Sequence, residues 1–507
     1  MEKQKNGKNE KFQSLIILIA SLTLGIIFNY FFVDQPVGIS FFLYTLLILT
    51  ILIILSKTLG KNLNKKDLIL SIPLIFFSAM VFVRSSTLLI FLNIVTSLFI
   101  LLLIAKTSFQ KPLKKFLASD YVKTIFLPFK FILPLGQTIS KLFSSSTSKK
   151  NNLPQIIRGI LITIPILAIF LLLFSSADLI FEKYISEIIN IHITQETIAR
   201  ILVILVVTLI FTGAYSYIFT KEKEEQNKIS KEISLGHIEL SILLSSINIL
   251  FLIFIIIQLT YLFGGEQNIS SQGFTYSQYA RRGFFELIAV AVISFLLIFF
   301  TDKYKEKNQT EHKKIFKYLS SILIIQVMII MYSAIVRLSL YEQAYGLTTL
   351  RMYSHAFIFL LVIIFCLLLY KIHKQTTEET FSLQLFISVL LFLASMNIIN
   401  PDAFIANYNI KNAEAINKLD TDYICYLSDD AIPYSIKILD SQDEVNKRNF
   451  ASCLYQKTLK RKRTSNWQSY NISHSKAQKL LDERKQELEK YKDYLPLQKM
   501  EITTKEE

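Results

Sequence analysis

The stretch SLIILIASLTLGIIFNYFFV, residues 14–33, decides the fold class of this chain. It is apolar over about 20 residues, the length that an α-helix needs to cross a bilayer. Ten further runs of similar character follow it, at 38–56, 68–83, 87–105, 156–176, 197–219, 238–263, 284–300, 315–336, 352–370 and 381–399. Hydrocarbon offers the backbone no hydrogen-bond partner, so each run must be helical, and the runs are too long and too uniformly apolar for barrel strands. The sequence therefore predicts an all-α, polytopic helical membrane protein with about eleven spans.

The composition of the whole chain agrees with this prediction. Hydrophobic residues make up 52% of the 507 residues, which is above the range of soluble chains of this size. The formal net charge is +16, but the lysines lie in short loops between apolar runs, where they orient spans rather than form one basic face. We therefore expect membrane lipids, and no nucleic acid, as partners.

The distribution of positive charge predicts the orientation. With the N-terminus in the cytoplasm, the inside loops carry 30 Lys and Arg, whereas the outside positions carry 7. Cytoplasmic loops retain positive charge, so we predict a cytoplasmic N-terminus, and an odd number of spans places everything after Ile399 outside. The segment 121–143 is apolar but interrupted by lysines and prolines, and it is expected to lie in the membrane interface; if it crossed, every later span would be inverted.

Four regions follow from this pattern. They are the first four spans over 1–105, a basic amphipathic cytoplasmic segment over 106–155, seven spans with outer-face motifs over 156–399, and a small helical extracytoplasmic domain over 400–507. Cys425 and Cys453 both lie in the last region. A disulfide between them would close a loop of about 28 residues and stabilise the domain by roughly 3 kcal/mol. Two buried free thiols are the alternative.

Polar residues inside the predicted spans more often join helices by hydrogen bonds than bind ions. They are Asn29, Asn93, Asn248, Gln258, Gln326 and Asn397.

The candidate site comes from two polar stretches at span boundaries, FTYSQYARRGFFEL (274–287) and RLSLYEQAYGLTTLRMYSH (337–355). Six of the seven outside cations are arginine, whereas all but one of the inside cations are lysine. Arginine binds carboxylate or phosphate through its planar fork and stays charged when partly desolvated. The predicted ligand-binding residues are Tyr276, Tyr279, Arg281, Arg282, Glu286, Arg337, Tyr341, Glu342, Tyr345 and Arg351.

Charge counting predicts the ligand. Glu286 and Glu342 supply two carboxylates against four arginines in these stretches, so we expect an outer-face site for a lipid phosphate, a lipid-linked sugar phosphate or an acidic polymer. The alternative is an ordinary aromatic belt with snorkelling and salt-bridged edge residues.

The local signals in the second stretch predict its backbone. Gly346 is expected to end one helix, and Thr348 or Thr349 to cap the next, with Arg351 in its first turn and His355 one turn deeper.

Other chemistry has no support in the sequence. The six histidines show no metal-ligand spacing, and no Walker loop, GxGxxG or GxSxG motif occurs. We therefore predict no cofactor and no metal site.

Four separated motifs carry a family resemblance. They are the two stretches above, NPDAFIANYNI (400–410) followed by LDTDYICYLSDDAIP (419–433), and NWQSYNISHSKA (466–477). In this order, over roughly 240–480 and not over the first 150 residues, they resemble the uncharacterised bacterial multi-pass membrane family catalogued as domain of unknown function 4173, with its relative 4153. The resemblance implies an integral membrane protein of the bacterial cytoplasmic membrane and supplies no activity.

Three classes of function remain. We favour a non-enzymatic envelope sensor or assembly partner, which binds an anionic or lipid-linked envelope ligand and a protein partner through its C-terminal domain. A membrane enzyme acting on a lipid-linked substrate is the alternative, with Glu286 or Glu342 as base, and it needs a carboxylate free of its arginine. A secondary transporter ranks last, because this chain has only 13 glycines and almost no charge inside its predicted spans.

Overall fold

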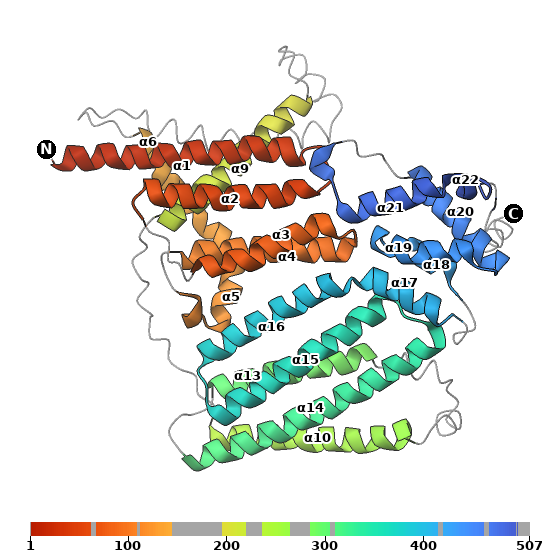
Figure 1. Cartoon of the computed structure of the whole chain (residues 1–507). Coiled ribbons are helices and arrows are strands. Elements are labelled where there is room, and N and C mark those ends of the chain that lie inside the picture. Colours follow the sequence, from red (N-terminus) through yellow and green to blue (C-terminus); the bar gives the residue numbers. More distant parts are fainter. Residues whose placement is uncertain are drawn as a thin grey trace, which may run out of the picture. The chain divides into compact units, whose positions relative to one another are not determined.

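The computed structural model (Figure 1) describes residues 2–61, 67–108, 112–143, 195–219, 236–263, 284–304, 310–413, 419–460, 466–492 and 494. Every regular element in these ranges is a helix, which confirms the predicted all-α class for this part of the chain. The chain forms two compact units. The first consists of Met1–Arg84, Leu88–Glu224 and Arg463–Ile472, and the second of Ser85–Thr87, Glu225–Lys462 and Ser473–Glu507.

Eight helical segments in the described residues are long and apolar enough to cross a membrane. They are Glu10–Phe32, Ile39–Thr58, Thr87–Thr107, Ala199–Phe219, Ile238–Gln258, Lys314–Gln343, Thr349–Lys374 and Glu378–Ile399. Each coincides with one of the eleven predicted runs. The run at 68–83 forms a shorter apolar helix, the run at 284–300 lies in a helix of its own, and the run at 156–176 lies outside the described residues.

The first unit is built from long helices and several short ones. Its helices are α1 (Glu2–Phe32), α2 (Ile39–Thr58), α3 (Ser71–Val83), α4 (Thr87–Thr107), α5 (Ala118–Ile125), α6 (Ile132–Phe143) and α9 (Gln195–Phe219), with 3-10 turns η1 (Asp67–Leu70), η2 (Leu113–Lys115), η3 (Leu127–Phe131) and η6 (Trp467–Ser469). Helices α1 and α9 pack at short range because residue 25 is glycine. A Cβ atom on Gly25 would overlap the Thr208 side chain and the Ile204 carbonyl.

The segment 121–143 folds as three short pieces, α5, η3 and α6. Pro128 lies at the start of η3, where its fixed φ and missing N–H are tolerated. None of the three pieces has the length to cross a bilayer. Its location in the membrane interface stays a prediction.

The second unit contains five long helices followed by short ones. The long helices are α10 (His237–Phe263), α13 (Phe284–Tyr304), α14 (Thr310–Tyr345), α15 (Thr349–Lys374) and α16 (Glu378–Ile399). The elements that follow them are α17 (Pro401–Lys411), α18 (Thr421–Tyr426), η4 (Asp429–Ala431), α19 (Ile432–Ser435), η5 (Ile436–Asp440), α20 (Glu444–Lys460), α21 (Ile472–Glu483) and α22 (Lys485–Glu489). Helices α10, α13, α14, α15 and α16 form a bundle in which neighbours pack side by side (Figure 1).

Polar side chains join two helices of this bundle, as predicted. Asn248 on α10 donates its side-chain amide to the Leu319 carbonyl on α14 (3.1 Å), and Gln326 on α14 donates to the Asn248 carbonyl (3.1 Å). These reciprocal bonds fix the register of α10 against α14, where packing of apolar side chains alone is weakly specific.

The helices that follow α16 share one hydrophobic core. Its members include Ile405 on α17, Ile424 on α18 and Phe450 on α20. Leu347 and Met352, from the turn between α14 and α15 and the start of α15, pack into the same core. The turn that carries the candidate site is therefore held by the helices of the C-terminal region.

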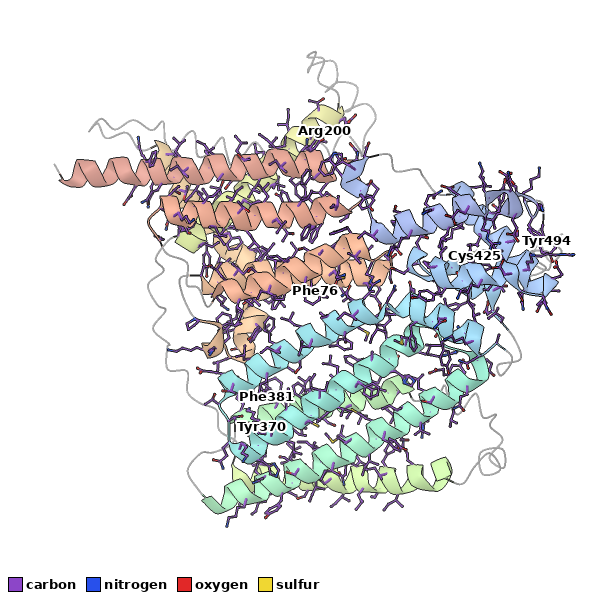
Figure 2. The ribbon with its side chains drawn as sticks, in the orientation of Figure 1. Phe76, Arg200, Tyr370, Phe381, Cys425 and Tyr494 are labelled. Atoms are coloured by element: carbon purple, nitrogen blue, oxygen red, sulfur yellow. A yellow bond between two sulfur atoms is a disulfide. The ribbon has the colours of Figure 1, made fainter. Side chains whose placement is uncertain are left out.

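A buried ion pair lies in the last turns of α13 and α15. Lys371 Nζ is 2.7 Å from Asp302 Oδ2, and the two side chains are 6% and 10% exposed. The same ammonium lies 5.1 Å from the ring centroids of both Phe299 and Phe381, the second of which is labelled in Figure 2. Lys371 is thus neutralised by a carboxylate and enclosed by two aromatic faces.

Candidate functional site

The structure divides the predicted ligand-binding residues into two groups. Tyr276, Tyr279, Arg281 and Arg282 lie outside the described residues. Glu286 is exposed in the first turn of α13. The other predicted residues lie on α14 and α15, and Arg337 among them is buried.

The turn between α14 and α15 has the predicted form. Gly346 adopts a left-handed φ of 75°, which glycine reaches without steric cost, and its N–H donates to the Glu342 carbonyl (2.7 Å). Thr348 then caps α15, because its side-chain oxygen accepts from the Arg351 backbone N–H (3.4 Å). The end of α14 and the first turn of α15 are therefore brought next to each other.

Arg351 contacts the end of α14 with its side chain. Its guanidinium carbon lies 4.1 Å from the centroid of the Tyr341 ring, and its Nη1 donates to the Gly346 carbonyl. The Tyr341 ring in turn lies 4.9 Å from that of Tyr345, which is exposed. The guanidinium of Arg351 therefore stacks on Tyr341, which in turn contacts Tyr345. Its contacts with the Gly346 carbonyl and the Tyr341 ring are both with neutral groups.

Glu342 meets two side chains that sequence reasoning did not assign to it. His355 Nε2 lies 3.5 Å from Glu342 Oε2, a distance suited to an ion pair when the imidazole is protonated. The Tyr408 phenol, from α17, is hydrogen-bonded to the same carboxylate. Burial raises the pKa of Tyr408 above its ordinary value, and the charge of Glu342 and the hydrogen bond to it raise that pKa further.

Asp429 and Asp430, in the sequence Ser428-Asp429-Asp430 (the SDD motif), form a second polar cluster, which the sequence did not reveal. Asp430 is buried and accepts hydrogen bonds from Ser85 N (2.6 Å), Ser85 Oγ (2.8 Å), Ser86 N (3.1 Å) and Ser473 Oγ (2.6 Å). A buried carboxylate needs such donors. Two acidic residues directly followed by the apolar AIP sequence were the one available signal that they lie inside.

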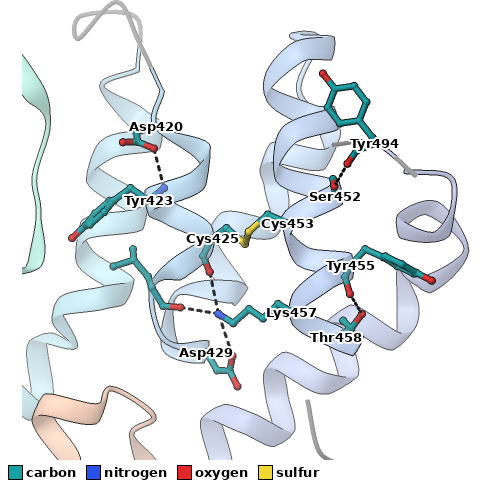
Figure 3. Close-up of a disulfide and its surroundings, with 11 residues drawn as sticks. Asp420, Tyr423, Cys425, Asp429, Ser452, Cys453, Tyr455, Lys457, Thr458 and Tyr494 are labelled. Atoms are coloured by element: carbon teal, nitrogen blue, oxygen red, sulfur yellow. Dashed lines mark hydrogen bonds and ion pairs between the residues drawn. A yellow bond between two sulfur atoms is a disulfide. The ribbon is translucent and has the colours of Figure 1, made fainter. Parts of the chain in front are cut away.

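Asp429 contacts two basic side chains. Its carboxylate contacts His474 Nδ1, and it lies 3.6 Å from Lys457 Nζ (Figure 3). Lys457 also donates to the Cys425 carbonyl (3.1 Å) and the Leu427 carbonyl (2.7 Å). A disulfide joins Cys425 on α18 to Cys453, which lies one helical turn before Lys457 on α20.

Other residues of the stretches that carry the family resemblance form hydrogen bonds with one another. The Asn409 side chain exchanges two hydrogen bonds with the Leu347 backbone, both 2.8 Å long, and the Tyr423 hydroxyl accepts from the Thr349 N–H (2.6 Å). These polar motif residues therefore have an internal structural role.

The family model described as Domain of unknown function (DUF4153) matches residues 71–438. The chain belongs to this family. No curated protein and no solved structure matches it.

The DUF4153 match corrects the extent of the resemblance seen in the motifs. It begins at the start of α3, whereas the motifs left out the first 150 residues. It includes the α14–α15 turn, Tyr408 and both aspartates of the SDD motif, and it ends before Cys453 and the NWQSYN sequence. The similarity to domain of unknown function 4173 rests on the motifs alone.

Within the described ranges, no group of three His, Cys, Asp or Glu side chains is arranged to hold a metal ion.

Proposed function

We propose that this protein is a non-enzymatic membrane protein of the bacterial cell envelope, which binds an anionic ligand at the α14–α15 turn. The favoured ligand is the phosphate of a lipid headgroup or of a lipid-linked envelope component. One observation supports the proposal: within the described residues the Arg351 guanidinium contacts two neutral groups, the Gly346 carbonyl and the Tyr341 ring, and its charge is then neutralised by the ligand. The exposed Tyr345 ring beside it offers a stacking surface.

The orientation is part of the proposal. We place the N-terminus in the cytoplasm and both the α14–α15 turn and the region after Ile399 outside. The distribution of Lys and Arg, 30 against 7, supports this orientation. The disulfide between Cys425 and Cys453 supports it independently, because disulfides persist in oxidising compartments. The C-terminal helices would then be available to a protein partner in the envelope.

Lipid-induced stabilisation tests the site. The purified protein is titrated with short-chain phosphatidylglycerol or phosphatidylcholine, and the unfolding temperature is followed. We expect phosphatidylglycerol to stabilise the wild type more. Loss of a charge-assisted hydrogen bond costs about 1.5–3 kcal/mol, so Arg351→Gln should weaken the binding of phosphatidylglycerol by about 10- to 150-fold. Equal stabilisation by both lipids, or an unchanged affinity in Arg351→Gln, would refute the proposal.

A second candidate is a membrane enzyme with Glu342 as general base. This function needs a carboxylate free of arginine, and the Glu342 carboxylate contacts His355 and Tyr408. Replacing Glu342 by Gln separates the two candidates. An enzyme would lose its function while phosphatidylglycerol binding stayed intact, whereas a binding protein would keep both.

A further inference from the structure

The sequence NWQSYN, residues 466–471, lies across the ends of three helices of the first unit. The Ile39 N–H, at the start of α2, donates to the Tyr470 carbonyl (3.0 Å). The Asn471 side chain donates to the Arg84 carbonyl (2.8 Å), directly after α3. Asn466 donates to Gln35, in the turn between α1 and α2 (2.9 Å). Residues remote in the sequence are therefore fixed to one end of α1, α2 and α3.

Backbone contact makes this attachment specific. A Cβ atom added to Gly38 would lie 2.5 Å from the Ser469 carbonyl carbon and 2.7 Å from the Tyr470 oxygen. Real Cβ atoms do not approach backbone so closely, so a larger residue at position 38 would push the segment away.

Three amphipathic aromatic side chains remain half-exposed at this end. The Trp467 ring lies edge-on to Phe31, with centroids 5.6 Å apart, and 6.4 Å from Tyr30. The exposed fractions are 48% for Trp467, 47% for Tyr470 and 57% for Tyr30. Trp and Tyr have an apolar body and a polar atom, and they concentrate where hydrocarbon meets the headgroups.

The level of these rings follows from the helices that carry them. The candidate spans Glu10–Phe32 and Ile39–Thr58 end and begin on either side of the turn that NWQSYN contacts. If both helices cross the bilayer, their shared end lies at the boundary between acyl chains and headgroups. Packing against Phe31 and hydrogen bonding to Ile39 hold the segment at that depth.

We propose that the NWQSYN segment is a membrane-interface anchor, whose partner is the phospholipid headgroup layer contacted by Trp467, Tyr470 and Tyr30. The anchor attaches the chain between α20 and α21 to the bilayer surface. It is independent of the anion site at the α14–α15 turn, which lies in the other unit.

Trp467 is the only tryptophan of the chain, so its fluorescence reports on this segment alone. The full chain is reconstituted in phosphatidylcholine vesicles whose acyl chains are brominated either near the headgroup end or near the tail end. We expect bromine near the headgroups to quench Trp467 more than bromine near the tails. Aqueous iodide should quench it several-fold less than it quenches free N-acetyl-tryptophanamide.

Every other outcome overturns the anchor. Quenching by iodide alone would put the segment in water, and stronger quenching by tail bromine would put it in the hydrocarbon core. Quenching by neither would mean that protein covers the indole. A depth reference comes from Trp467→Phe combined with Leu98→Trp, since Leu98 is exposed in mid-helix on α4 and should respond most to tail bromine.

Gly38→Ala tests the attachment itself. It should shift Trp467 emission to longer wavelength and raise its quenching by iodide, because the added methyl displaces Ser469. Gly136→Ala is the matched control, since a Cβ there meets nothing within 4 Å. Unchanged emission in a folded Gly38→Ala variant would contradict the geometry on which the anchor rests.

Discussion

The cations at the two ends of helix α15 have different contacts. In the last turn, Lys371 is paired with Asp302 at 2.7 Å and enclosed by the Phe299 and Phe381 rings. In the first turn, the Arg351 guanidinium contacts a backbone carbonyl and a tyrosine ring. Lys371 is neutralised within the bundle, whereas in the part of the chain that the structure describes the contacts of the Arg351 guanidinium are with neutral groups. We propose that the charge of Lys371 has a structural role, whereas the charge of Arg351 binds a ligand.

Removal of the buried charge should have the largest effect. Lys371→Met leaves Asp302 buried without this partner, and breaking a buried pair costs about 3–5 kcal/mol of unfolding free energy. Combining it with Asp302→Leu should restore most of the loss, because both desolvated charges are then gone. Denaturant unfolding of the wild type, Lys371→Met, Asp302→Leu and the double variant in detergent measures the coupling. Lys374→Met, at an exposed position on the same turn, is the control. An equal loss of unfolding free energy in this variant would mean that the buried pair does not contribute more to stability than an exposed lysine.

Opening the disulfide should affect the first-turn end selectively. Tyr423, on the disulfide-bonded α18, hydrogen-bonds to Thr349 at the start of α15. Cys425→Ser with Cys453→Ser should cost about 3 kcal/mol. Hydrogen exchange should accelerate in α18, α20 and the first turn of α15, while the last turn stays protected. Cys366→Ser, at an exposed free cysteine, should change neither region. Uniform acceleration along α15 would contradict a local effect.

Loss of the ring under Arg351 should have a smaller effect. Tyr341→Leu removes the cation–π contact, which is worth about 0.5–1 kcal/mol at a partly exposed site. The affinity for phosphatidylglycerol should fall with it, because the guanidinium is no longer held in one orientation. Tyr332→Leu, at an exposed tyrosine of the same helix, is the matched control. Equal affinities in the two variants would show that Tyr341 does not position Arg351.

The smallest expected effect is confined to alkaline pH. The pKa of Tyr408 is raised in the folded state, first by burial and then by Glu342. The folded state therefore holds this proton more tightly than the unfolded chain. Its contribution to stability is intact below the ordinary phenol pKa of about 10 and is lost as pH rises through the folded pKa. The stability difference between wild type and Tyr408→Phe should shrink above about pH 10; a difference independent of pH would contradict the Glu342 contact.

Local features of the candidate site were predictable from sequence, because each depends on residues close in the chain. Gly346 ends α14 through its own backbone freedom, and Thr348 caps α15 three residues before its partner. The all-helical class followed equally directly from the length of the apolar runs. Asn248 and Gln326 were predictable as helix-joining residues from chemistry alone, since a polar group inside a span needs a partner.

The contacts that give the site its character could not be predicted in this way. Tyr408 reaches Glu342 from another helix, and Asp302 meets Lys371 across two helices. The SDD aspartate Asp430 binds Ser85, which is 345 positions away. No periodicity or spacing encodes such pairs, because they depend on how complete helices pack. The excess of arginine over carboxylate stays a prediction, because Arg281 and Arg282 lie outside the described residues. The partners of Glu342 could be found only from the fold.

A structure of the protein in phosphatidylglycerol nanodiscs tests the central claim most directly. The account predicts density for a phosphate group at the Arg351 guanidinium, beside the Tyr345 ring, and the loss of that density in Arg351→Gln. A guanidinium enclosed entirely by protein groups, with the lipid phosphates elsewhere, would contradict it.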